Sequence, residues 1–168
     1  MTESYSYIVN YICMPTIVIL DNIRSAHNVG SIFRTSDAGG ISKIYLCGVT
    51  PCPIDRFGRE QTDISKVSLG AEKSIEWEHV SSTKECIEKI KKGGFQIIAL
   101  EQSPTSVDYK KIISPDKFAI VLGEETKGLP QEIVSLCDIV AEIEMLGEKE
   151  SLNVATAFGI FLFRILNI

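Results

Sequence analysis

A chain of 168 residues, 45% hydrophobic and 23% charged, has the length and balance of one globular domain with a sizeable core. Its net charge of −5 does not favour a strongly basic nucleic-acid-binding protein. The apolar C-terminal run is broken by Thr156, Gly159 and Arg164, so no segment is predicted to cross a membrane. Residues 1–16 lack the basic start and continuous apolar core of a signal peptide, so we expect a cytoplasmic protein.

The acidic charge is unevenly distributed along the chain. Acidic and basic residues cancel over residues 1–100, whereas residues 101–150 carry a net charge of −6. A polyanion would therefore meet the first part of the chain rather than the second.

The cysteines and histidines do not form a metal-binding pattern. The five cysteines include no C-x-x-C pair, and there are only two histidines. An odd number of scattered cysteines argues against a disulfide framework and a zinc site, so we expect buried or incidental thiols and no metal. The cysteines are Cys13, Cys47, Cys52, Cys86 and Cys137.

In chain order, predicted strands alternate with predicted helices. Up to residue 80 the predicted elements are a strand Thr16–Leu20, a helix capped by Asn28 and stopped by Gly39-Gly40, a strand Lys43–Val49, one or two helical turns within Ile64–Ser74, and a strand Ile75–Val80. From residue 82 they are an amphipathic helix Ser82–Lys92, a strand Phe95–Leu100, a short helix Val107–Ile113, a strand Phe118–Leu122, a helix Pro130–Cys137, a strand Asp138–Met145 and an apolar helix from Val154. The alternation predicts an α/β fold, a mainly parallel sheet with helices on both faces.

Three polar clusters follow predicted strands, at residues 22–34, 123–128 and 147–153. Ligands of open parallel sheets bind beyond the carboxyl ends of the strands, so these clusters predict one shared site. None of them contains a P-loop, a G-x-G-x-x-G fingerprint or a G-x-S-x-G elbow. NTP hydrolysis, hydride transfer and serine-hydrolase chemistry are therefore disfavoured.

The same clusters carry a resemblance to a known family. NIRSAHNVGSIFRTSDAGG (22–40), FAIVLGEETKGL (118–129) and IEMLGEKESLNVATAFGIFLF (143–163) resemble, in order and spacing, motifs 1 to 3 of the SpoU-type (TrmH-like) RNA 2′-O-ribose methyltransferases. SKVSLGAEKS (65–74) is similar to the family's intervening segment. The resemblance covers nearly the whole chain and implies the SPOUT fold, with a deep C-terminal trefoil knot, and a homodimer.

The resemblance also implies an activity and its residues. It implies S-adenosyl-L-methionine as cofactor and methyl transfer to a ribose 2′-hydroxyl of tRNA or rRNA. The implied catalytic residues are Asn28, Arg34, Glu125, Ser151 and Asn153. The implied cofactor-binding residues are Leu122, Gly123, Glu125, Ile143, Met145, Gly147, Ser151 and Leu152. Glu144 stands where the family usually has proline, which predicts a tuned pocket rather than an inactive one.

Each candidate residue also has a simpler interpretation. Asn28 could only cap its helix, and Ser151 could only cap the last one. Glu125 could pair with Lys127, and Arg34 could be a solvated helix residue. Five side chains are candidate RNA contacts, against the alternative of an ordinary polar surface: Arg24, His27, Arg56, Arg59 and Lys66.

Two functions remain open at this level: the methyltransferase, and a catalytically silent dimeric RNA-binding or assembly module on the same fold. A guanidinium is not expected to lose its proton, so Arg34 fits a phosphate grip and alkoxide stabiliser better than a general base. The first strand begins near Thr16, so we expect one catalytic domain over residues 1–168 without a separate N-terminal RNA-binding domain. The motifs do not identify the RNA or the nucleotide.

Overall fold

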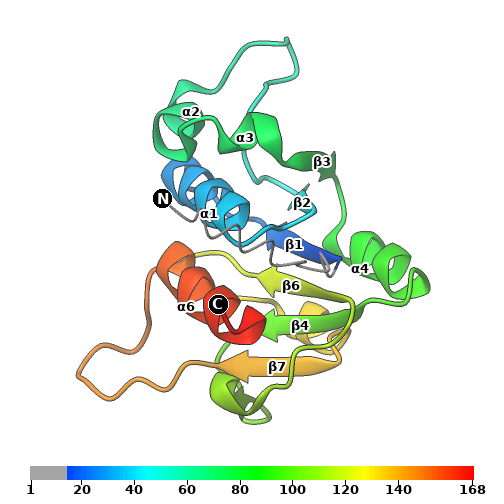
Figure 1. The fold of residues 1–168 in the computed structure, drawn as a ribbon, viewed down its shortest axis with the longest axis vertical. Coiled ribbons are helices and arrows are strands. Elements are labelled where there is room, and N and C mark those ends of the chain that lie inside the picture. Colours follow the sequence, from blue (N-terminus) through cyan, green and yellow to red (C-terminus); the bar gives the residue numbers. More distant parts are fainter. Residues whose placement is uncertain (1–14) are drawn as a thin grey trace, which may run out of the picture.

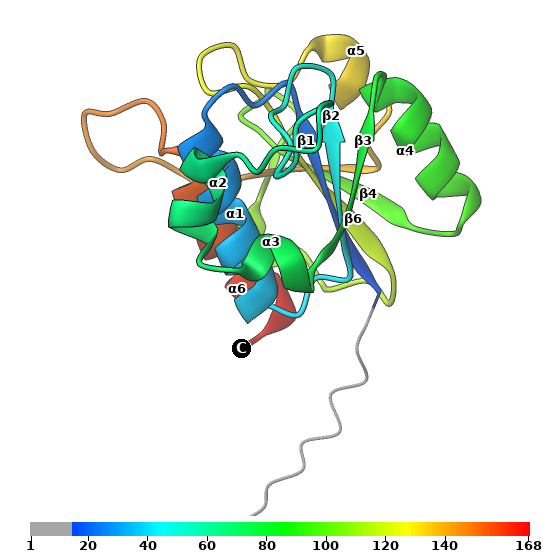
Figure 2. The same ribbon diagram turned by 90° about the horizontal axis from the view of Figure 1, so that it is seen from above.

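The structure, a computed structural model, describes residues 15–168 as a seven-stranded sheet between two layers of helices (Figures 1 and 2). The strands are β1 Thr16–Asp21, β2 Lys43–Cys47, β3 Glu76–Val80, β4 Gln96–Leu100, β5 Val107–Asp108, β6 Phe118–Leu122 and β7 Ile139–Glu142. They lie in the order β3-β2-β1-β6-β4-β7-β5, and every pairing is parallel. Residues 1–14, which include Cys13, lie outside the described residues.

Helices cover both faces of the sheet. They are α1 Ala26–Ala38, α2 Thr62–Ser68, α3 Ala71–Ser74, α4 Thr83–Lys92, α5 Gln131–Val134 and α6 Val154–Leu166, with a short 3-10 helix at Tyr109–Lys111. Figure 2 shows α1, α2, α3 and α6 on one side of the sheet and α4 and α5 on the other. The predicted α/β class, a mainly parallel sheet with helices on both faces, is confirmed.

Two hydrophobic cores follow from the alternation of side chains along the strands. In β1, Val18 and Leu20 join the core under α1 and α6, whereas Ile17 and Ile19 join the core under α4. Strands that are buried on both faces need continuous apolar runs, and β1 and β6 are buried along their whole length. β6 leads into one wall of the cavity described below, and β1 leads into the segment that bonds to Glu125.

Three predicted elements differ most from the structure in type or extent. The predicted helix Val107–Ile113 is a two-residue strand followed by the 3-10 helix, because the Asp108 side chain accepts a hydrogen bond from the Lys110 N–H and closes a tight turn. The predicted helix Pro130–Cys137 is helical only in α5. The strand expected to reach Met145 ends at Glu142, where the chain leaves the sheet to line a cavity.

The four cysteines within residues 15–168 are free, and Cys47 and Cys86 are buried. In the same residues no helix combines the length and apolar character that a bilayer crossing needs. No group of three His, Cys, Asp or Glu side chains that could hold a metal ion occurs among them.

Gly30 marks a close contact between α1 and α2. A Cβ there would lie 2.7 Å from the Ile64 carbonyl oxygen and 2.9 Å from Val67 Cβ. We expect Gly30→Ala to lower the free energy of unfolding by about 1–3 kcal/mol, because the two helices must move apart. Urea denaturation measures the change.

Gly159 in α6 is the matched control. An added Cβ would meet only Thr35 Cγ2, at 3.7 Å, which is ordinary contact. Gly159→Ala should leave the free energy of unfolding unchanged or raise it by up to about 1 kcal/mol, because alanine is the better helix former. Equal losses in Gly30→Ala and Gly159→Ala would contradict the packing argument.

Candidate functional site

A cavity of about 510 Å³ opens at the carboxyl ends of β4, β6 and β7. Its walls come from residues 100–102 after β4, from the turn 122–128 after β6, and from the segment 141–157 between β7 and α6. Eight predicted site residues line it: Leu122, Gly123, Glu125, Ile143, Met145, Ser151, Leu152 and Asn153. Two of the three predicted polar clusters therefore meet directly in one cavity.

The turn 123–128 is packed too tightly for side chains at its ends. A Cβ on Gly123 would lie 2.5 Å from the Gly128 carbonyl carbon, and Gly128 has a φ of +66°, a conformation that favours glycine. The Glu101 carboxylate accepts hydrogen bonds from the N–H groups of Leu129, at 2.7 Å, and Gln102, at 2.9 Å. One wall of the cavity is thereby fixed to the end of β4.

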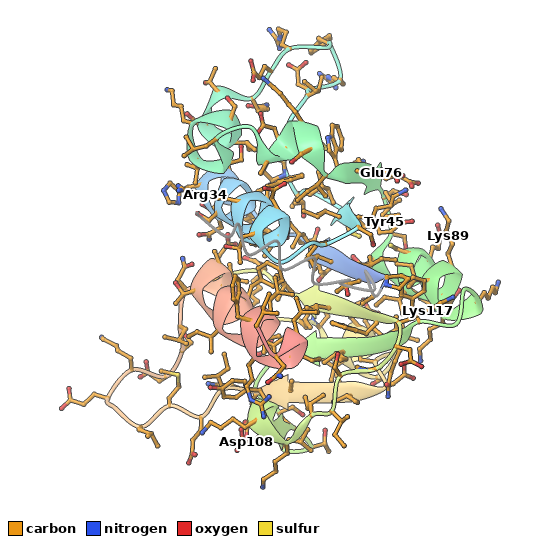
Figure 3. The ribbon with its side chains drawn as sticks, viewed as in Figure 1. Arg34, Tyr45, Glu76, Lys89, Asp108 and Lys117 are labelled. Atoms are coloured by element: carbon orange, nitrogen blue, oxygen red, sulfur yellow. The ribbon has the colours of Figure 1, made fainter. Side chains whose placement is uncertain are left out.

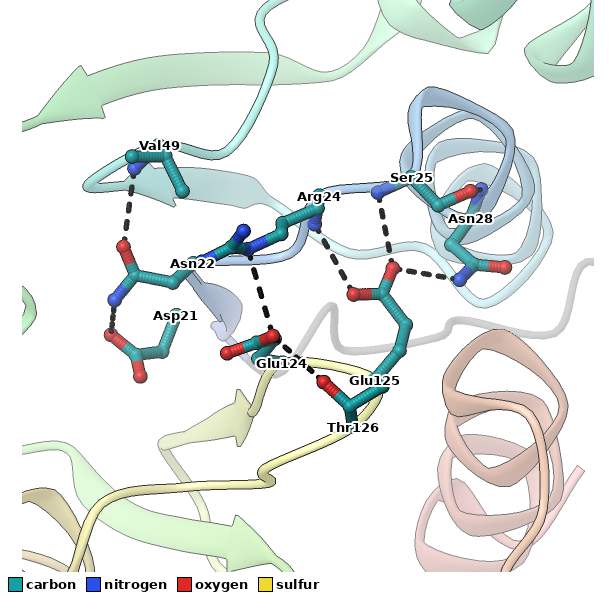
Figure 4. A network of polar contacts seen from close by, with 9 residues as sticks. All are labelled: Asp21, Asn22, Arg24, Ser25, Asn28, Val49, Glu124, Glu125 and Thr126. Atoms are coloured by element: carbon teal, nitrogen blue, oxygen red, sulfur yellow. Dashed lines mark hydrogen bonds and ion pairs between the residues drawn. The ribbon is translucent and has the colours of Figure 1, made fainter.

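Glu125 connects this turn to the start of α1 (Figure 4). Its carboxylate accepts hydrogen bonds from the backbone N–H groups of Arg24, at 3.2 Å, and Ser25, at 3.1 Å, and from Asn28 Nδ2, at 2.8 Å. Burial alone would raise the pKa of Glu125, but these donors outweigh it and hold the pKa below its ordinary value. Glu125 is therefore a carboxylate at neutral pH and acts as an acceptor.

Asn28 is hydrogen-bonded in turn to Asn153 at the start of α6. Its Oδ1 accepts a hydrogen bond from Asn153 Nδ2 at 3.0 Å, and Asn153 Oδ1 accepts from the N–H groups of Ala155 and Thr156. A carboxylate can only accept hydrogen bonds, and a backbone N–H can only donate them. The Glu125 carboxylate at one end of this series of hydrogen bonds and the N–H groups of α6 at the other therefore set the orientation of both amides. Glu125, Asn28 and Asn153 thus hold three distant segments in one geometry.

The helix caps differ from the sequence interpretation. Ser25, not Asn28, caps α1, because its Oγ accepts from the Asn28 N–H at 3.2 Å. Asn153, not Ser151, caps α6. Within residues 15–168 no ion pair joins Glu125 to Lys127, since the Glu125 carboxylate bonds to α1 instead. Asn28 and Ser151 are therefore not explained as helix caps.

Other predicted residues lie outside the cavity lining. Arg34 is exposed on α1, six residues after Asn28, which is about 9 Å along the helix axis (Figure 3). Gly147 is exposed, with open space around it. Within one chain, the structure does not bring either residue to the cavity.

The five candidate RNA contacts are scattered. Arg24 pairs with Glu124 at 3.6 Å. His27 lines a smaller hollow that also contains Asn28 and Asn153. The others belong to the excursion between β2 and α3: Arg56, Arg59 and Lys66.

Several residues of the site were missed from the sequence, among them Glu101 and Glu124 in the cavity lining. Ser25 supplies both the α1 cap and an N–H donor to Glu125. Gln102 lines the cavity, and its Nε2 donates to the Glu150 carbonyl oxygen at 2.8 Å, which ties down the segment 147–153. The signal was present, because Glu101-Gln102-Ser103 is one more polar cluster after a predicted strand.

The composition of the cavity indicates its ligand chemistry. Glu101, Glu124 and Glu125 outnumber Lys127, so the walls favour a cation. Apolar side chains, Leu122, Ile143, Met145 and Leu152 among them, offer a surface for a flat apolar group. The volume is in the range of small-molecule sites, so the cavity fits an organic cation with an apolar ring system.

The chain is similar in sequence to a family of RNA methyltransferases. The model of the family described as the SpoU rRNA Methylase family matches residues 15–163. A Staphylococcus saprophyticus protein assigned to the TrmH family of tRNA/rRNA methyltransferases is 30% identical over 152 residues, which are 90% of this chain and 58% of that protein. The chain therefore spans just over half the length of such relatives.

Solved structures show the same arrangement of elements. The AdoMet-bound rRNA methyltransferase of Sinorhizobium meliloti superposes with a TM-score of 0.82 and 32% identity, over 91% of this chain and 56% of that one. The TrmH/SpoU tRNA modifying enzyme of A. aeolicus gives a TM-score of 0.80 and 29% identity, over 92% and 75%.

Proposed function

Because the chain belongs to the SpoU rRNA methylase family, we propose that it transfers a methyl group from S-adenosyl-L-methionine to a ribose 2′-hydroxyl of tRNA or rRNA in the cytoplasm. The observation that carries the proposal is the hydrogen-bonded chain Glu125–Asn28–Asn153 beside the acidic, partly apolar cavity. It joins the three segments that resemble the family's motifs.

The cavity residues suit this cofactor. When bound, S-adenosyl-L-methionine supplies an electrophilic methyl group on a positively charged sulfur. Glu101, Glu124 and Glu125 complement that charge. Leu122, Ile143, Met145 and Leu152 would hold the adenine, and Gly123 leaves the backbone free to approach it.

The remaining residues have roles in positioning and charge. Asn28 and Asn153 have fixed amide orientations, which suits them to align a ribose, because much of the rate of a displacement comes from alignment. The exposed Ser151 hydroxyl lines the same cavity and can hydrogen-bond a ribose hydroxyl. We assign to Arg34 the grip on the target phosphate and the stabilisation of the developing alkoxide.

We further propose that the functional unit is a homodimer. Support comes from α6, where Ile160 and Phe163 remain 39% and 38% exposed in the single chain. In such a dimer Arg34 of one subunit would serve the cavity of the other, which would give a catalytic place to an exposed side chain that lies outside its own chain's cavity. The C-terminal trefoil knot that the family resemblance implies is also part of the proposal; within it, the bonds to Gln102 and Asn28 would hold segment 147–153 in place.

Cofactor binding tests the proposal most directly. We expect isothermal titration of the purified protein with S-adenosyl-L-methionine to give a Kd of about 1–100 μM, typical of enzyme–substrate affinities. Asn153→Ala should weaken binding, because the variant releases both Asn28 and the start of α6. Ile113→Ala, which truncates an exposed side chain outside the cavity lining, is the control. If the wild type showed no measurable binding of S-adenosyl-L-methionine, the methyltransferase proposal would be wrong and the catalytically silent RNA-binding module would be favoured.

A further inference from the structure

Phe57 is a large apolar side chain that the fold leaves uncovered. It is 67% exposed, in the loop of residues 48–61 that leaves the carboxyl end of β2. Figure 1 shows this loop extending past α2 and α3 at the top of the molecule. The cavity and the proposed catalytic residues make no use of it.

The loop around Phe57 is an ordered turn. Asp55 Oδ1 accepts hydrogen bonds from the Phe57 N–H at 2.8 Å and the Arg59 N–H at 2.9 Å. Ile54 and Glu60 form an antiparallel bridge across its base, and Gly58 takes a φ of +78°. The backbone therefore holds the ring outward in a defined place.

Two guanidinium groups lie over the ring and are held differently. Arg59 lies 5.0 Å from the ring centroid; its Nε donates a hydrogen bond to Asp55 Oδ2 at 2.8 Å, and its Nη2 forms an ion pair with the same oxygen at 2.8 Å. Arg56 lies 4.8 Å from the centroid and forms no ion pair within residues 15–168. Arg59 is thus held in place by Asp55, whereas Arg56 has no acidic partner among these residues and is free to leave the ring.

We propose that Phe57 is a stacking platform for an unpaired RNA base and that Arg56 moves from the ring to the adjoining phosphate. The inference rests on the proposed function and narrows its substrate to RNA that has a single-stranded segment. A nucleotide matches Phe57 and Arg56 because it offers an aromatic base for the ring and a phosphate for the guanidinium. Stacking of a base on an aromatic side chain is also stronger than an exposed cation–π contact, so the base can displace Arg56 from the ring. Bases inside a duplex cannot reach the ring.

Binding of two labelled RNAs tests the inference by fluorescence anisotropy: an oligouridylate of about 12 nucleotides and a blunt duplex of about the same length. We expect Phe57→Ala to weaken oligouridylate binding about tenfold and duplex binding hardly at all. Ile113→Ala, which truncates an apolar side chain that is 88% exposed elsewhere, is the matched control and should bind both RNAs as the wild type does.

A tryptophan at the same position reports contact directly. Phe57→Trp should retain affinity for oligouridylate, and its emission should be quenched by the RNA more than that of the wild type, which has only Trp77. Unchanged affinity in Phe57→Ala, no added quenching in Phe57→Trp, or no oligouridylate binding by the wild type would each overturn the inference. Titration with S-adenosyl-L-methionine separates the two proposals, because Phe57→Ala should bind the cofactor normally.

Discussion

Replacing Arg34 by alanine is expected to reduce methylation of bulk RNA by about 10²–10³-fold, the usual loss when one preorganised charge at a reacting oxygen is removed. The fold should hardly change. Arg34 is exposed and makes no ion pair within residues 15–168, so the free energy of unfolding should stay within about 0.5 kcal/mol of the wild type. Transfer of radiolabelled methyl groups and thermal denaturation measure the two quantities.

Two further variants sharpen the assignment of Arg34. Lys92→Ala removes an exposed charge at the end of α4, on the opposite face of the sheet, and should retain full activity. Arg34→Lys keeps the charge without the planar fork and should fall between wild type and alanine. Arg34→Ala activity above a tenth of the wild type would show that the central residue is misassigned.

Mixed dimers decide whether Arg34 acts across the subunit boundary. Arg34→Ala and Glu125→Ala chains, refolded together, contain one intact site only if Arg34 serves the partner's cavity. Partial recovery of activity is expected. Absence of recovery in a mixture that forms heterodimers would place Arg34 and Glu125 in the same subunit's site or exclude Arg34 from it.

Glu125→Ala is expected to reduce activity about 100-fold or more, with a smaller loss of stability. Three N–H donors lose their acceptor, among them Asn28 Nδ2, and the orientation of both amides is released. Misplacement of a catalytic group by about 1 Å is enough for such a loss. The site is exposed and water replaces part of the bonding, so the free energy of unfolding should fall by only about 1–2 kcal/mol.

Lys127→Ala is the control from the same turn, because Lys127 also lines the cavity but makes no ion pair with Glu125 in the described part of the chain. It should leave stability unchanged.

The stability difference between wild type and Glu125→Ala should also depend on pH. The folded-state pKa of Glu125 is lowered, so its contribution is full above 4.5, the ordinary value, and disappears as pH falls through the folded value. A difference that is constant down to pH 3 would contradict the assigned carboxylate bonding.

The sheet could be predicted where local signals agree. The run Phe118–Leu122 was predicted with its observed bounds, because a continuous apolar stretch between Lys117 and Gly123 has few alternatives to a buried strand. Val107–Ile113 was not, because its short mixed pattern suits a helix and a turn equally. There the single bond from Lys110 N–H to Asp108 decides the conformation.

The sequence could predict many of the residues that form the site, but not which hydrogen bonds join them. Asn28 and Ser25 are both good caps, and local sequence cannot choose between them. The choice is made by Glu125, 97 residues away, which accepts from Asn28 Nδ2 and so leaves the cap to Ser25. Gln102 was missed for a similar reason, since its partner is a backbone carbonyl 48 residues later.

Asn153 gives the first turn of α6 and the amide of Asn28 a common support, because one side chain serves both. Fraying of that helix end therefore disconnects Asn28 at the same moment. Local unfolding and loss of the site are then one event with one opening free energy. A ligand that binds Asn28 would therefore stabilise the first turn of α6. Conversely, a contact that stabilises α6 would hold Asn28 in its binding geometry.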